Sequence, residues 1–83
     1  MSELTAHEIE TLLEQLETEE RDISLRRRRL HDRIAIFPDS PAKEELERRE
    51  REISTERREL HRRIDDLRAQ RNELRAQHGE AAL

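Results

Sequence analysis

The chain has 83 residues, of which 17 are basic and 21 acidic, with one Phe, no Trp or Tyr and no Cys. So few aromatic side chains exclude a layered globular core built around them, and the lack of Cys excludes disulfides and thiolate metal sites. The basic and acidic residues are interleaved and leave a net charge of −4, which argues against a nucleic-acid clamp. We therefore expect no direct DNA binding.

The remaining composition favours a helical rod. Glu, Arg, Leu, Ala and Ile dominate, and both prolines fall within one short stretch. No run of residues is apolar enough for a signal peptide or a membrane span. We expect one domain over residues 1–83, located in the cytoplasm and without membrane contact.

A first helix is predicted over about residues 5–36. Thr5 and Glu8 have the spacing of a capping box, and Pro38 ends the helix because it disfavours the helical conformation for Phe37. Between these signals the apolar residues follow a heptad, in which Glu20 and Arg27 occupy two core positions. The apolar seam of this helix consists of Ile9, Leu13, Leu16, Ile23, Leu30, Ile34 and Phe37.

A loop over residues 37–40 and a second helix over about residues 41–78 follow. Ser40 is the expected N-cap, Pro41 suits the first helical position, and Gly79 is a candidate C-cap. The second seam again mixes apolar and polar residues. Its apolar members are Leu46, Ile53, Leu60, Ile64, Leu67 and Leu74, and its polar members are Glu50, Arg57, Arg71 and His78.

Two long helices joined by so short a loop predict an all-α fold, an antiparallel coiled-coil hairpin. Residues that face each other should then have numbers that sum to about 80, as Leu13 and Leu67 do, because the midpoint lies in the loop. In this register the polar core residues meet apolar partners, as Glu20 meets Leu60. We therefore expect four consecutive layers in the middle of the hairpin to be poorly sealed.

The polar residues of the seam belong to a duplicated pattern. Residues 20–35 and 50–65 are identical at ten of sixteen aligned positions, which indicates an internal duplication. Three- and four-residue steps keep the shared polar side chains on one face of each helix, where they form a stripe. In the hairpin the two stripes should lie side by side and be related by a pseudo-twofold axis. We expect ion pairs of Glu20 with Arg57 and of Arg27 with Glu50. The stripes are Glu20, Ser24, Arg27 and His31, and Glu50, Ser54, Arg57 and His61.

The residues alone leave more than one explanation open. Polar core residues can set the register of a coiled coil, so the chain could be a structural adaptor or oligomerisation module. A metal site is not expected, because the register places His31 and His61 too far apart to share an ion. An enzyme is not expected either, since an exposed helix face offers no enclosed pocket or oxyanion hole.

The second copy, Glu50-x3-Ser54-x2-Arg57-x3-His61-x3-Asp65, resembles the signature of the RsiG family of actinobacterial anti-sigma factors, E-x3-S-x2-R-x3-Q-x3-D. The two patterns agree in spacing at five positions and in identity at four. His61 stands where the family has Gln, which keeps hydrogen-bonding capacity but makes it depend on pH. The first copy matches in the same way, except that Ala35 replaces the final Asp.

The resemblance implies a function for both copies. In that family the motif binds cyclic di-GMP on an antiparallel coiled coil, and the loaded protein holds a sigma factor of the WhiG or flagellar type away from RNA polymerase. It implies a stronger half-site of Glu50, Ser54, Arg57, His61 and Asp65, and a weaker one of Glu20, Ser24, Arg27 and His31. Whether the chain acts as a monomeric hairpin or as a homodimer stays open.

Overall fold

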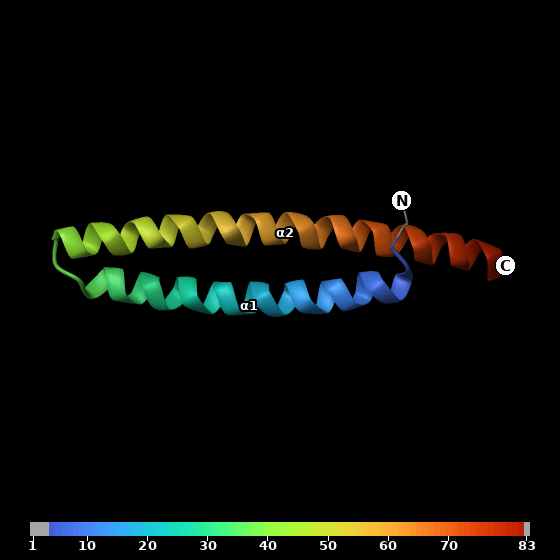
Figure 1. Cartoon of the computed structure of the whole chain (residues 1–83), viewed down its shortest axis with the longest axis horizontal. Helices are drawn as coiled ribbons and strands as arrows, with labels where there is room; N and C mark the ends of the chain where they lie inside the picture. The colour runs from blue at the N-terminus through green and yellow to red at the C-terminus, as the bar shows by residue number, and fades with distance from the viewer. Residues whose placement is uncertain (1–3, 83) are drawn as a thin grey trace.

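The computed structural model describes residues 4–82, with side chains placed for residues 4–77. It contains two helices, α1 (Ala6–Ile36) and α2 (Pro41–Ala82), which run side by side in opposite directions (Figure 1). The hairpin is a rod of 63 × 25 × 15 Å. The 42 residues of α2 account for its length at about 1.5 Å per residue. The predicted all-α helical hairpin is confirmed.

Both ends of α1 are set by the signals predicted from the sequence. The Glu8 backbone N–H donates to Thr5 Oγ1 at 3.1 Å, and the Thr5 N–H donates to Glu8 Oε1 at 3.2 Å, which completes the capping box. At the other end Phe37 is extended, with φ −82° and ψ 136°. This is the conformation that a following proline imposes, so Pro38 ends the helix.

Ser40 caps α2 as expected. Its hydroxyl accepts a hydrogen bond from the Lys43 N–H at 3.2 Å, and its carbonyl accepts one from the Glu44 N–H at 3.2 Å. The predicted end of this helix at about residue 78 is wrong, because α2 continues through Gly79 to Ala82. Gly79 is followed by Glu and two Ala, which are strong helix formers, and a glycine inside a helix costs only about 1 kcal/mol relative to alanine.

The apolar core of the hairpin is interrupted in its middle. One cluster of buried residues lies toward the open end of the hairpin, and a second buried pair, Leu30 and Leu46, lies toward the turn. Between them no residue of segments 17–29 and 47–59 is buried. This gap contains the middle two of the four layers that were predicted to be poorly sealed, whereas Leu60 and Leu30 of the outer two layers are buried. The main cluster consists of Ile9, Leu13, Leu16, Leu60, Ile64 and Leu67.

The duplicated segments have nearly the same environment on the two helices. Residues 20–35 and 50–65 fall into the same burial class at every aligned position except one, where Ile34 is half-buried and Ile64 is buried.

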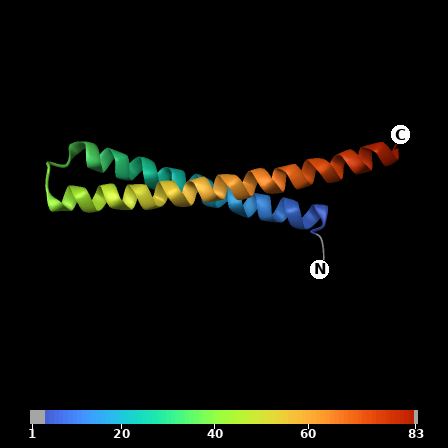
Figure 2. The same cartoon turned by 90° about the horizontal axis from the view of Figure 1, so that it is seen from above.

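Seen from above, the helices cross, and α2 continues past the start of α1 (Figure 2). Neither helix of the described chain has the length and hydropathy to span a membrane.

Candidate functional site

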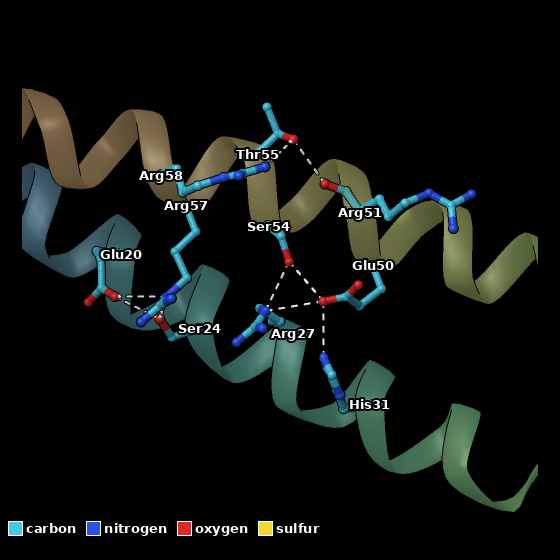
Figure 3. Close-up of polar contacts among 10 residues, drawn as sticks. All are labelled: Glu20, Ser24, Arg27, His31, Glu50, Arg51, Ser54, Thr55, Arg57 and Arg58. Atoms are coloured by element: carbon cyan, nitrogen blue, oxygen red, sulfur yellow. Dashed lines mark hydrogen bonds and ion pairs between the residues drawn. The ribbon is translucent and has the colours of Figure 1, made fainter.

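A polar network occupies the gap in the apolar core. Its members are the eight polar side chains of the two stripes. Figure 3 shows several of them reaching across from one helix to the other. Arg57 Nε lies 3.4 Å from Glu20 Oε1. Arg27 Nε lies 3.2 Å from Glu50 Oε1. Both cross-helix ion pairs predicted from the register are therefore present.

The two serines connect the members of each ion pair. Ser24 Oγ donates to Glu20 Oε1 at 2.7 Å and accepts from Arg57 Nε at 2.9 Å. In the second copy, Ser54 Oγ donates to Glu50 Oε1 at 2.8 Å and accepts from Arg27 Nε at 2.9 Å. Each hydroxyl therefore holds a carboxylate of its own helix against a guanidinium of the other. The repetition of these contacts with nearly equal distances confirms the predicted pseudo-twofold arrangement.

The histidines make contacts that the sequence analysis missed. His61 Nε2 lies 3.0 Å from Glu20 Oε1, and His31 Nε2 lies 3.0 Å from Glu50 Oε1. The residue numbers of each pair sum to 81, so the register already placed them level across the two helices. Among the described residues no group of three or more His, Cys, Asp or Glu side chains is placed to hold a metal ion.

The network divides into two clusters, and each cluster combines both copies of the motif. Cluster 1 takes its carboxylate and hydroxyl from α1 and its arginine and histidine from α2, and cluster 2 does the reverse. The separation into a half-site on α2 and another on α1, implied by the family resemblance, therefore differs from the grouping in the structure. Cluster 1 is Glu20, Ser24, Arg57 and His61, and cluster 2 is Glu50, Ser54, Arg27 and His31.

Asp65 lies outside both clusters. It is exposed, as is Ala35 at the matching position of the first copy. Asp65 takes part in none of the hydrogen bonds or ion pairs found among residues 4–77. It is four residues beyond His61 and therefore on the same face of α2. A role for Asp65 in ligand binding stays a prediction.

The surroundings of Glu20 and Glu50 keep these carboxylates ionised. Only 20% of the Glu20 side chain and 19% of the Glu50 side chain are exposed. The hydrogen bond from Ser24 lowers the pKa of Glu20 most, with smaller contributions from His61 and Arg57. The hydrogen bond from Ser54 does the same for the pKa of Glu50, helped by His31 and Arg27. Burial acts in the opposite direction and is outweighed in both cases.

These lowered pKa values predict acid lability. A carboxyl group whose pKa is lower in the folded state stabilises the fold above its ordinary pKa and loses that contribution as the pH falls through its folded value. We expect the melting temperature to drop as the pH falls below about 4.5, the ordinary value for glutamate. A variant with Glu20→Gln and Glu50→Gln should show a smaller drop in thermal melts followed by circular dichroism.

The matched control for this titration is a variant with Glu52→Gln and Glu56→Gln, which removes the same charge from exposed positions of α2. It should keep the acid sensitivity of the unmodified chain. Equal pH profiles for all three proteins would show that the network carboxylates contribute nothing to the acid-labile stability.

Comparison with known proteins gives one match, which covers α1. A family model described as RsiG-like matches residues 1–38, a segment that includes the first copy of the polar pattern. Residues 1–38 are similar to the RsiG family. No curated protein and no solved structure gave a match. The RsiG-like match falls on the copy that ends in Ala35, whereas the copy with all five polar positions lies on α2.

Proposed function

We propose that this protein is an anti-sigma factor that binds cyclic di-GMP on its hairpin and, when loaded, holds a sigma factor of the WhiG or flagellar type away from RNA polymerase. The observation that carries the proposal is the pseudo-twofold polar network in place of an apolar core at the middle of the hairpin. Cyclic di-GMP is a twofold-symmetric dianion with two guanines. A twofold arrangement of Arg, Ser and Glu matches both its symmetry and its chemistry.

The arginines keep hydrogen-bonding capacity for such a ligand. Arg27 and Arg57 make their network contacts through Nε, and their terminal nitrogens have no partner among the described side chains. The side chains are 37% and 36% exposed, so these nitrogens can be reached from solvent. A guanidinium donates well to phosphate oxygens and to the O6 and N7 edge of guanine.

The glutamates keep unused capacity as well. All network contacts of Glu20 and Glu50 involve Oε1, which leaves Oε2 without a partner among residues 4–77. A carboxylate oxygen can accept from the N1 and N2 groups of guanine. The lowered pKa values of both glutamates favour this acceptor form at neutral pH.

A single chain supplies both clusters. All eight network residues lie within one hairpin, and the pseudo-twofold axis runs between α1 and α2. This arrangement supports the monomeric hairpin as the nucleotide-binding form. The sigma-factor partner and the cytoplasmic location rest on the RsiG-like match to residues 1–38.

The second candidate is a structural coiled-coil adaptor without a nucleotide ligand. One observation favours it, since each ionised network residue already has an oppositely charged partner within the chain. Polar layers of this kind can specify register at a cost in stability. The two candidates differ in whether cyclic di-GMP binds.

Titration calorimetry with cyclic di-GMP separates them. We expect the unmodified chain to bind, and Asp65→Ala to weaken binding by roughly ten- to a hundredfold, the effect of losing one charge-assisted hydrogen bond. Asp66→Ala is the matched control, because Asp66 is also exposed but one residue off the motif. No heat of binding with the unmodified chain would favour the adaptor. Equal affinities for the two variants would remove Asp65 from the site.

A further inference from the structure

A shallow depression on the surface of the network is lined almost entirely by potential cations. Its lining combines Ser24 and residues from both helices, with no carboxylate among them. Arginine side chains converging on one depression are suited to an anion with several acceptor oxygens, such as a phosphodiester. The lining residues are Ser24, Arg27, Arg28, His31 and Arg57.

Arg28 is the member of this lining that lies outside the duplicated stripes. It takes part in no hydrogen bond or ion pair among the side chains of residues 4–77, and it is exposed. Two other arginines of α1 do have partners on the same helix, since Arg26 lies 3.2 Å from Asp22 and Arg21 donates to Thr18 at 3.4 Å. The charge of Arg28 is therefore available beside the depression.

The equivalent residue of the second copy is in a different state. Arg58 Nη2 donates to Thr55 Oγ1 at 3.3 Å, three residues earlier on α2 (Figure 3). At the matching position before Arg28 the chain has Leu25, which offers no acceptor. The duplication thus preserved both arginines, but only Arg58 has a threonine three residues earlier that accepts its hydrogen bond.

We propose that Arg28 is a phosphate-binding residue of the nucleotide site and forms, with Arg57, a subsite for one phosphodiester group of the ligand. The inference rests on the proposed function and makes the two copies unequal. The first copy binds phosphate through Arg28. The second copy supplies Asp65, whose counterpart is Ala35, so the two copies contribute different contacts to a symmetric ligand.

The duplication provides a matched pair of variants. Arg28→Gln and Arg58→Gln each remove one exposed positive charge from equivalent positions. We expect Arg28→Gln to weaken cyclic di-GMP binding by about tenfold and to lower its salt sensitivity, while Arg58→Gln changes affinity less than about twofold. Leu25→Thr, which gives Arg28 the acceptor that Arg58 has, should weaken binding in the same direction. Circular dichroism melts check that each variant folds as the unmodified chain does.

Equal losses for Arg28→Gln and Arg58→Gln, or no loss for Arg28→Gln, would overturn the inference and leave the proposed function standing. Absence of cyclic di-GMP binding to the unmodified chain would instead overturn the proposed function. In that case pyrophosphate is the second probe, and its binding is measured by the changes that it causes in the amide chemical shifts of the chain. Pyrophosphate binding that Arg28→Gln weakens and Arg58→Gln spares would preserve the phosphate subsite, and equal effects would overturn it.

Discussion

Arg57→Lys is expected to weaken cyclic di-GMP binding by roughly a hundredfold, although the charge is unchanged. Arg57 Nε already donates to Ser24 Oγ at 2.9 Å and lies 3.4 Å from Glu20 Oε1. Its two terminal nitrogens are left for the ligand. Lysine has a single nitrogen, which cannot maintain these contacts and also present a planar pair of donors to a guanine or phosphate. Titration calorimetry gives the affinity directly.

The control for this substitution is Arg62→Lys, at an exposed position of α2 that is not part of the network. It should bind cyclic di-GMP as the unmodified chain does. Melting curves of both variants separate loss of the site from loss of the fold. If Arg57→Lys folds and binds with unchanged affinity, Arg57 acts only as a charge in the coiled coil and is not a ligand-binding residue.

Local signals in the sequence were sufficient to predict the hairpin. The capping box at Thr5, the proline after Phe37 and the N-cap at Ser40 each act within one helical turn, so they could be recognised without tertiary information. The antiparallel register followed from the seam and the position of the loop. That register was accurate enough to predict the ion pairs of the network.

Features that depend on side-chain reach or on competing local preferences were not predicted. The approach of His61 to Glu20 requires a particular rotamer, although the register placed the two residues level. The end of α2 depends on the balance between Gly79 and the helix formers after it, and a single glycine does not end a helix on its own. The difference between Arg28 and Arg58 depends on side-chain contacts, since Arg58 donates to Thr55 on its own helix.

The second large effect is expected on complex formation with a sigma factor. If nucleotide and sigma factor bind the hairpin cooperatively, each tightens the binding of the other by the same factor, typically about 5- to 150-fold. The sigma factor then has two dissociation constants for the hairpin, one without and one with bound nucleotide. At a protein concentration between these two values, adding the nucleotide changes a mixture of separate proteins into a complex. Arg57→Lys, which is expected to bind the nucleotide about a hundredfold more weakly, should remove this effect at nucleotide concentrations that saturate only the unmodified chain.

The measurement that tests this most directly is light scattering after size-exclusion chromatography of the purified chain mixed with a flagellar-type sigma factor from the same cell, with and without cyclic di-GMP. We predict separate proteins without the nucleotide and a complex in its presence. A complex that forms equally well in both conditions, or no complex at saturating cyclic di-GMP, would contradict a nucleotide-dependent anti-sigma function.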